Sequence, residues 1–436
     1  MPTTKRTDIV ARCEAAGVHQ VELQFADISG ALKSVAVPLR RLPDVLGAGE
    51  WFDGSALEGR ARELESDMYL RPDAATLAVA ATEPPTARLI CDVVTPDGAP
   101  YSGDCRSTLR RVLDEAAEAG LEYRVAAEVE FFLFHDSDDG LRPLEDSSSY
   151  FERGGGRVRE VELEIVAGVE AYGIEVESSH HEVGGGQFEL DLPLQPALVA
   201  ADVITALKPQ VKDLARRRGL LASFMPKPLG DGPGSGMHTH QVLNGPKGSN
   251  LFADKADAYG LSQVGRRFAA GQLEHAPGMC ALLAPLVNSY KRLVPGYEAP
   301  VAGSWGRRNR SALIRVPQGA AKDARVELRL PDPSCNPYLA FAAMLAAGLD
   351  GVERELELGP PMEEVEHGYL DESRLVARPL PASLGEALEA LAADDLLTDT
   401  LGGVVLDLFR SAKEIEWSTY RRQVTAWELD AYLQSS

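Results

Sequence analysis

A stretch rich in glycine, proline and aspartate, TPDGAPYSGD at residues 95–104, separates two parts of the chain with different sequence patterns. Before it, β-forming runs alternate with Gly, Pro and Asp, which is typical of short strands. After it, strand and helix patterns interleave, and the last hundred residues are mainly helical. The sequence therefore predicts an α+β protein, with a strand-rich domain at residues 1–100 and a larger α/β domain at residues 101–436 whose C-terminus is helical.

The predicted elements follow from periodicity and from capping residues. In the N-terminal part, strands are expected at residues 21–28, 34–39, 77–82 and 87–94. In the larger part, Ser107 or Thr108 is expected to begin a helix that ends at Gly120. Beyond it we expect a strand at 123–134, a helix at 158–173, strands at 174–183 and 187–192, and helices at 198–217, 335–351 and 416–433.

The composition limits the class of protein. A chain of 436 residues with 44% hydrophobic residues can bury a sizeable core. Its formal net charge of −22 would repel nucleic acid and anionic membranes, so we expect neither as a partner. The five cysteines are scattered without metal-ligand spacing, which indicates reduced packing residues. Because it lacks a signal-peptide pattern and any run of about 18 apolar residues, we expect a cytoplasmic protein.

Two acidic residues on one predicted strand give the first indication of chemistry. Residues two apart on a strand share a face, so Glu128 and Glu130 point the same way while Val129 and Phe131 point oppositely. Two like charges at this separation repel unless a cation lies between them. A solvated strand face is the better explanation of an isolated Glu-x-Glu, so the interpretation depends on other segments.

Two glycine-containing segments supply further candidate ligands. A glycine-rich turn can bring Glu182 and Glu189 toward one point, and a glycine loop enters a strand on which His238 and His240 share a face. Carboxylates with one imidazole suit Mg²⁺ or Mn²⁺ better than Zn²⁺. A packed core histidine is an equal alternative for His240, and the glycines of residues 229–236 either make turns or allow close approach to a ligand.

Cations concentrate in one segment of this acidic chain. Residues 291–329 carry nine cations against three acids, a local net charge of +6. The cations are Lys291, Arg292, Arg307, Arg308, Arg310, Arg315, Lys322, Arg325 and Arg329, and the acids are Glu298, Asp323 and Glu327. Arginines beside carboxylates that bind divalent metal ions are typical of enzymes that transfer phosphoryl groups. An exposed basic face is the alternative interpretation, and a carboxylate-rich metallohydrolase is the rival enzyme class.

Motifs along nearly the whole chain resemble those of glutamine synthetases. They are Phe52-Asp-Gly-Ser55, Glu65-Ser-Asp-Met68, Glu128-Val-Glu130, His180-His-Glu182, Gln187-x-Glu189, Gly234-Ser-Gly-Met-His238, residues 291–300, Asn309-Arg-Ser311, Ile314-Arg315, Arg325-Val-Glu-Leu-Arg329 and Asn336-Pro-Tyr338. The length resembles the short bacterial type I subgroup. The resemblance implies a β-grasp domain at residues 1–100, a catalytic domain at 101–436, and a homododecamer of two stacked hexameric rings with each site between subunits.

The resemblance also implies a role for each site residue. One metal ion would be held by Glu130, Glu182 and Glu189, and another by Glu128, His238 and Glu327. Glutamate would lie near Gly234, Arg292 and Arg329. ATP would lie near His240, Arg310, Arg315 and Arg325. The catalytic residues would be Asp53 from a neighbouring subunit, Glu298 on a flap loop, and Arg310. The implied reaction is ATP-dependent formation of a γ-glutamyl amide from L-glutamate through γ-glutamyl phosphate, with two or more Mg²⁺ or Mn²⁺ ions.

Three positions depart from the family pattern. Ala56 replaces a serine after Asp-Gly-Ser, Pro233 replaces an asparagine before Gly-Ser-Gly, and Val242 replaces a serine near the nucleotide. The first two changes leave more room and a less polar wall near the acceptor. We therefore expect a small primary amine as acceptor, with ammonia as the alternative because Asp53 and Glu298 are retained. A non-catalytic homologue would have broken metal or phosphate positions, whereas here they are intact.

Overall fold

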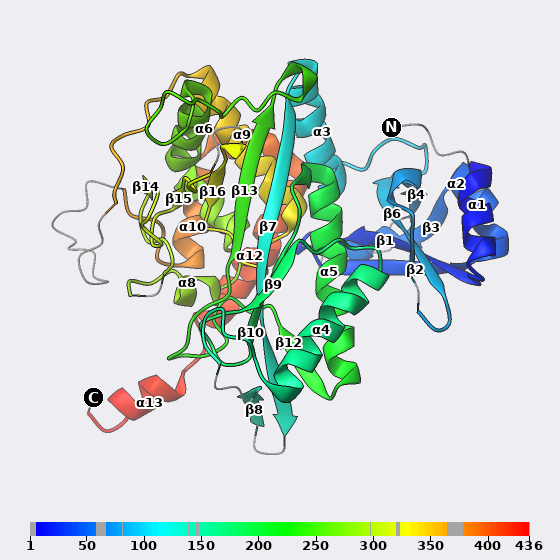
Figure 1. Ribbon diagram of the computed structural model, residues 1–436, viewed down its shortest axis with the longest axis horizontal. Coiled ribbons are helices and arrows are strands. Elements are labelled where there is room, and N and C mark those ends of the chain that lie inside the picture. Colours follow the sequence, from blue (N-terminus) through cyan, green and yellow to red (C-terminus); the bar gives the residue numbers. More distant parts are fainter. Residues whose placement is uncertain are drawn as a thin grey trace.

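The computed structural model describes residues 6–57, 67–80, 82–137, 140–144, 148–296, 298–319, 323–363 and 378–435. Residues 65, 66, 297 and 322, which belong to the motifs and the cation cluster named above, lie outside these ranges. Two sheets form two bodies that lie side by side (Figure 1).

The N-terminal sheet has the strand order β2-β1-β6-β4-β3, and β5 pairs with β6. Its central strands β1 and β6 run parallel, and its other pairs are antiparallel. Its elements are α1 (Arg6–Ala15), β1 (Gln20–Ala26), β2 (Leu32–Pro38), α2 (Leu42–Ala48), β3 (Glu50–Asp53), β4 (Asp67–Pro72), β5 (Ala78–Ala80) and β6 (Thr86–Val94). The four predicted strands are confirmed.

The prediction of strands alone in this part was wrong, because α1, α2, β3 and β4 were missed. Helix α1 buries only a narrow stripe that includes Ile9 and Cys13, four residues apart, so its sequence shows little helical periodicity. Leu42 and Val45 of α2 complete the same small core. Strands β3 and β4 are short and pair with each other, which gives a weak local signal.

The larger sheet is built around one long strand, β7 (Glu122–Ser137), which pairs with five others. The sheet order is β14-β15-β16-β13-β7-β10-β9, with β8, β11 and β12 also on β7. The strands are β8 (Gly140–Pro143), β9 (Ser178–His181), β10 (Gln187–Asp191), β11 (Gln195–Pro196), β12 (Leu220–Ser223), β13 (Met237–Asn244), β14 (Trp305–Gly306), β15 (Ile314–Arg315) and β16 (Val326–Leu328). Val129 and Phe131 of β7 enter the core, so Glu128 and Glu130 face the opposite side, as predicted.

The described part of the large domain also contains helices, most of which pack on the core face of this sheet or on one another, whereas the last one projects away and buries no residue (Figure 1). They are α3 (Cys105–Glu118), α4 (Gly156–Ala171), α5 (Ala197–Arg217), α6 (Gln263–Glu274), α7 (Ala276–Leu283), α8 (Ser289–Arg292), α9 (Pro337–Glu353), α10 (Leu384–Ala392), α11 (Asp395–Leu401), α12 (Gly403–Tyr420) and α13 (Ala426–Tyr432). Helix α9 is buried along most of its length. In the described part of the chain, no helix is both long and apolar enough to cross a membrane.

The predicted cap of α3 was wrong. Asp104, rather than Ser107 or Thr108, is the N-cap, and its carboxylate accepts hydrogen bonds from the backbone of Arg106 and Ser107. The carboxylate of Asp104 also accepts from the amide of Val93 on β6, so the cap helps to join the helix to the N-terminal sheet. The predicted end at Gly120 is confirmed by its positive φ of 76°.

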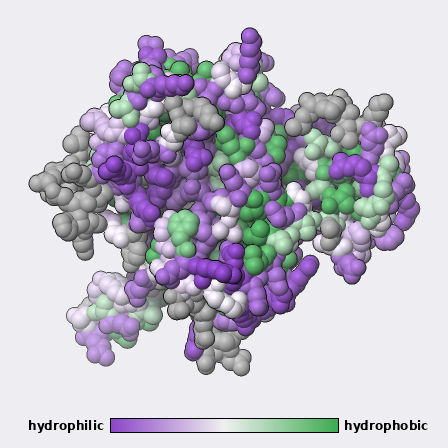
Figure 2. Space-filling view, viewed as in Figure 1, coloured by the Kyte–Doolittle hydropathy of each residue, from purple (hydrophilic) through white to green (hydrophobic). Residues whose placement is uncertain are grey.

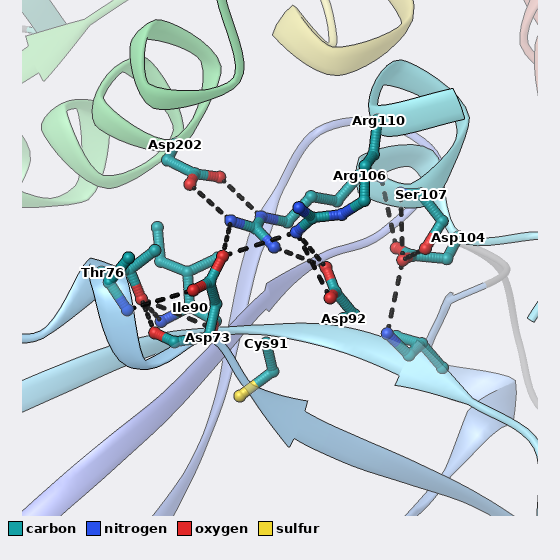
Figure 3. Close-up of polar contacts among 12 residues, drawn as sticks. Asp73, Thr76, Ile90, Cys91, Asp92, Asp104, Arg106, Ser107, Arg110 and Asp202 are labelled. Atoms are coloured by element: carbon teal, nitrogen blue, oxygen red, sulfur yellow. Dashed lines mark hydrogen bonds and ion pairs between the residues drawn. The ribbon is translucent and has the colours of Figure 1, made fainter. Parts of the chain in front are cut away.

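A buried arginine holds the two bodies together. Arg106, only 3% exposed, reaches from α3 between Asp202 on α5 and two aspartates of the N-terminal sheet, Asp73 and Asp92 (Figure 3). Its guanidinium binds both oxygens of Asp202, at 2.9 and 2.8 Å, and lies 2.9 Å from Asp73 and 2.5 Å from Asp92. Because both domains contribute carboxylates to one cation, separating the domains would leave buried charges unpaired.

We predict that Arg106→Met destabilises the protein by about 3 kcal/mol or more, because it leaves the aspartates around it without their shared partner. Unfolding in urea measures the change. Arg216→Met is the matched control, since Arg216 pairs with Asp213 on the exposed side of α5 and should change stability by less than about 0.5 kcal/mol. Equal midpoints for Arg106→Met and wild type would contradict the prediction.

Candidate active site

A cavity of about 990 Å³ lies on the face of the large sheet opposite the helices. Its walls come from β7, β9, β10, β13, the loop before β13 and the arginine-rich segment after α8. Hydrophilic side chains cover the surface around β14–β16, whereas hydrophobic ones gather over α5 and toward the N-terminal domain (Figure 2). A cavity of this size is large enough for a nucleotide and an amino acid together.

The register of three neighbouring strands assembles the first acidic group. His238 on β13 pairs across the sheet with Glu128 on β7, and the next strand, β16, brings Glu327 alongside. His238 Nδ1 lies 3.0 Å from Glu128 Oε2 and 4.0 Å from Glu327 Oε1. The ligand atoms of these three residues all lie within 4.8 Å of one another, so the structure brings together this predicted set.

The glycine-rich turn between β9 and β10 assembles the second group, as predicted for Glu182 and Glu189. Gly186 has a φ of +70°, which favours glycine, and a Cβ on Gly184 would clash with Phe132. The carboxylates of Glu182 and Glu189 lie 2.9 and 3.6 Å from Nε2 of His180. His180 completes this group, a residue that the sequence analysis did not select although it shares a strand face with Glu182.

Glu130 follows Glu128 on β7 and pairs across the sheet with Glu189 on β10, but among the described residues it belongs to none of the close clusters of possible ligand atoms. Its side chain is buried and accepts a hydrogen bond of 3.0 Å from Gln187. Burial and the nearby carboxylate of Glu182 raise the pKa of Glu130 to about 8. Burial, together with Glu130 and Glu128, also raises the pKa of Glu189.

Glu128 and Glu327 are charged despite their burial. Burial acts to raise the pKa of Glu128, but hydrogen bonds from His238 and His240 hold it well below its usual range. For Glu327, which is fully buried, the cations around it likewise outweigh burial and lower its pKa. Glu327 lies 2.6 Å from Nη1 of Arg329 and also pairs with Arg315.

This donor set fits divalent cations. Several carboxylates are held close together out of bulk water, and burial together with the repulsion among them raises the pKa values of Glu130 and Glu189. Carboxylate oxygens with an imidazole are hard ligands of the kind that Mg²⁺ and Mn²⁺ prefer. Burial and Arg329 lower the pKa of His238, which keeps its ring neutral and able to donate a lone pair.

Five arginines line the cavity: Arg292, Arg308, Arg310, Arg315 and Arg329. Arg310 forms an exposed pair with Glu298 at 3.0 Å and lies over the ring of Tyr150 at 5.1 Å. Arg292 is buried and donates to the backbone oxygens of Leu330 and Arg329. The Cβ of an alanine at Gly234 or Gly236 would come within 3 Å of this arginine, so these glycines allow the loop to approach it closely.

Four predicted site residues do not line the cavity, among them Glu327, which is fully buried and pairs with Arg315 and Arg329. Asp53 ends β3 in the N-terminal domain, where its Oδ1 accepts a hydrogen bond from the amide of Ser55. Arg325 is exposed just before β16. His240 is buried behind Glu128, with Nε2 at 2.7 Å from Glu128 Oε1.

The cavity also contains residues that the sequence analysis did not select. They are Tyr150, Phe151, Ser178, Ser179, His180, Val183, Asp191, Asp231, Gly296 and Ala299, whereas Arg308 belongs to the predicted cation cluster. Tyr150 and Phe151 lie in the polar loop after β8, where the sequence shows no periodicity that would relate them to β9. Of these residues, His180 and Asp191 could have been predicted from the sequence, because each is two residues from a predicted ligand in a strand pattern.

Comparisons with known proteins agree with this geometry. The sequence models of the glutamine synthetase β-grasp domain and of the glutamine synthetase catalytic domain match residues 17–96 and 102–432. The chain belongs to the glutamine synthetase family. Curated relatives named glutamine synthetase include those of Halobacterium salinarum, 43% identical over 97% of this chain and 95% of the relative, and of Thermus thermophilus, 44% identical over 98% of each.

A solved structure titled as a complex of GmaS with ADP is also similar, with a TM-score of 0.89, 32% identity, and coverage of 98% of this chain and 99% of that chain. Family membership confirms the predicted fold, a β-grasp domain followed by a larger mixed domain with a helical C-terminus. The protein is therefore an ATP-dependent glutamate ligase, a class that uses ATP and divalent metal ions. This assignment favours a ligase over the rival metallohydrolase.

We predict that Mg²⁺ binding to the substrate-free protein at pH 7 releases one or more protons, because the pKa values of both Glu130 and Glu189 are raised. Glu130, with a raised pKa of about 8, is mostly protonated at pH 7 before the cation binds. Apparent affinity should therefore rise with pH through 8. Calorimetry in two buffers with different ionisation enthalpies counts the protons, and Glu130→Gln should release fewer. Equal heats in both buffers at pH 7 would contradict the prediction.

Proposed function

We propose that this ligase joins the γ-carboxylate of L-glutamate to a small primary amine, using ATP and forming γ-glutamyl phosphate on the way. The supporting observation is the single cavity in which two acidic groups face five arginines, beside a loop wall made by Pro233 and Gly234. Metal-dependent phosphoryl transfer to a carboxylate needs both kinds of group around one space.

We assign the acidic residues to two cation sites. Glu130, Glu182 and Glu189 would hold one Mg²⁺ or Mn²⁺, and Glu128, His238 and Glu327 would hold another. When bound, these cations would neutralise the negative charge on the phosphate oxygens of ATP. The proximity of His180 to Glu182 and Glu189 adds a ring nitrogen to the first site or to its surroundings.

We assign each arginine to ATP or to glutamate from the contacts that its side chain makes in the structure. Arg310 and Arg315 would bind ATP phosphates, and the pair between Arg310 and Glu298 is exposed, so a phosphate can replace the carboxylate at little cost. Arg329 and the tethered Arg292, with Gly234, would hold glutamate. Arg325 and His240 stay proposed ATP contacts by family resemblance, since neither lines the cavity of the free chain.

The reaction then needs an electrophile and a free amine. The γ-carboxylate oxygen of glutamate would attack the γ-phosphorus of ATP, and the bond to ADP breaks. The amine nitrogen would attack the resulting acyl carbon, and phosphate leaves with the bonding electrons. Asp53 would bind the ammonium form and take its proton, and Glu298 would close the site against water. Because Asp53 lies outside the cavity of its own chain, we propose that a neighbouring subunit supplies it, in a dodecamer of two hexameric rings.

The acceptor is proposed from two residues. Ala56 follows the Asp53-Gly-Ser turn and carries no hydroxyl, and Pro233 in the cavity wall has neither a backbone N–H nor a polar side chain. Fewer polar partners disfavour a bare ammonium ion, whereas an alkyl group gains from an apolar wall. Ammonia is the second candidate, because the curated relatives at 43 and 44% identity are named glutamine synthetase.

The test is phosphate release from ATP with Mg²⁺ and L-glutamate, measured separately with ammonium, methylamine, hydrazine, ethanolamine and putrescine, with products identified by mass. A kcat/KM for one amine at least about tenfold above that for ammonium would support the proposal. Ammonium as the best acceptor would make the protein a glutamine synthetase. Phosphate release that needs no glutamate would contradict both.

We predict that Ala56→Ser with Pro233→Asn shifts the preference toward ammonium by about tenfold or more, because the two side chains restore a hydroxyl and an amide as polar partners. The ratio of kcat/KM values for ammonium and the preferred amine measures the shift. Val242→Ser is the matched control, since Val242 is buried in β13 and does not line the cavity. An unchanged ratio would mean that positions 56 and 233 do not select the acceptor.

A further inference from the structure

An exposed aromatic residue at the cavity edge has an unusual backbone. Phe151 is 64% exposed, and its φ of 59° lies in the left-handed region that non-glycine residues rarely adopt. Its backbone amide donates a hydrogen bond of 3.0 Å to the carbonyl oxygen of His181 on β9. Such strain persists only when surrounding contacts hold it, and it concentrates at functional sites.

The contact that this backbone allows is a ring stack on His180. The two rings are nearly parallel, at 10°, with centroids 4.3 Å apart. Tyr150 packs edge-on against Phe151, with centroids 4.5 Å apart, and its ring also lies beneath Arg310. The stack therefore covers one face of the imidazole and sets the plane in which its two nitrogens point.

The imidazole plane matters because of what lies in it. Nε2 of His180 is 2.9 Å from Glu182 and 3.6 Å from Glu189, and Nδ1 is 3.9 Å from Asp191. The two nitrogens of this ring thus lie beside three carboxylates, which would otherwise repel one another. If the ring turned, the carboxylates of Glu182 and Glu189 would lose the group between them.

We propose that Phe151 is a positioning residue which, through its stack on His180, fixes the imidazole between Glu182 and Glu189 and so preorganises this carboxylate pair for a divalent cation. The inference rests on the proposed assignment of these two glutamates to a cation site. Groups behind metal ligands typically change affinity by about 10–100-fold when they are removed.

The test measures Mn²⁺ binding to the substrate-free protein by electron paramagnetic resonance. Phe151→Ala should weaken one of the Mn²⁺ sites by about tenfold, while Phe151→Trp, which keeps a ring to stack, should stay within about threefold of wild type. Leu163→Ala removes another exposed apolar side chain, from α4, and should leave binding unchanged. Unaltered Mn²⁺ binding in Phe151→Ala would overturn the proposal.

A double-mutant cycle shows whether Phe151 acts through His180. In a His180→Asn background, Phe151→Ala should have little further effect on Mn²⁺ binding, since the ring that it orients is gone. An equal tenfold loss in both backgrounds would overturn the proposal. Phosphate release with glutamate is measured on the same preparations, so a protein that binds Mn²⁺ in the expected order but releases no phosphate would refute the proposed reaction and not the role of Phe151.

Discussion

Strand β7 has to satisfy two opposed requirements, and the rest of the large domain follows from them. Its Val129 and Phe131 side chains lie in the hydrophobic core, while Glu128 and Glu130 on the other face lie in the cavity. Placing carboxylates on a strand at the centre of a sheet costs free energy unless cations or donors surround them. The neighbouring strands β13, β10 and β16 are therefore the elements that bring histidines, further glutamates and arginines to this face.

The two carboxylates of β7 are not stabilised equally by the groups around them. Around Glu128 the protein itself supplies partners, two imidazoles and the arginines on Glu327, and the pKa values of both acids are lowered. Around Glu130, burial and the carboxylate of Glu182 outweigh Arg292 and Arg329, so the pKa of Glu130 is raised. Burial and the surrounding carboxylates likewise raise the pKa of Glu189. The unmet charge thus lies on the side of Glu130, Glu182 and Glu189. A cation that enters there relieves repulsion as well as forming bonds, which makes the two proposed cation sites physically different.

The sequence predicted the parts of this site that depend on local geometry. Alternation on a strand placed Glu128 and Glu130 on one face, and the glycine-rich turn brought Glu182 to Glu189, because both relations are set within a few residues. Contacts between distant segments left little local signal. The stack of Phe151 on His180 joins residues 29 positions apart, and Arg106 finds Asp202 on another helix. Helices α1 and α2 were missed because a small domain buries few residues on each.

The join between the domains bears on how a complete site can form. Arg106 ties the N-terminal sheet to α3 and α5, and on the same boundary Asn336 donates to the backbone oxygens of Asp27 and Ile28, where Gly30 lies against it too closely for a side chain. Two such buried contacts, on different elements, oppose a swing of the N-terminal domain. Asp53 is thereby held away from the cavity of its own chain, on a domain that lies across the molecule from β9 and β10 (Figure 1). A rigid domain that keeps Asp53 away from the cavity of its own chain favours its use by a second copy, so the ion pairs that stabilise one chain also support the proposal that the active site is shared between subunits.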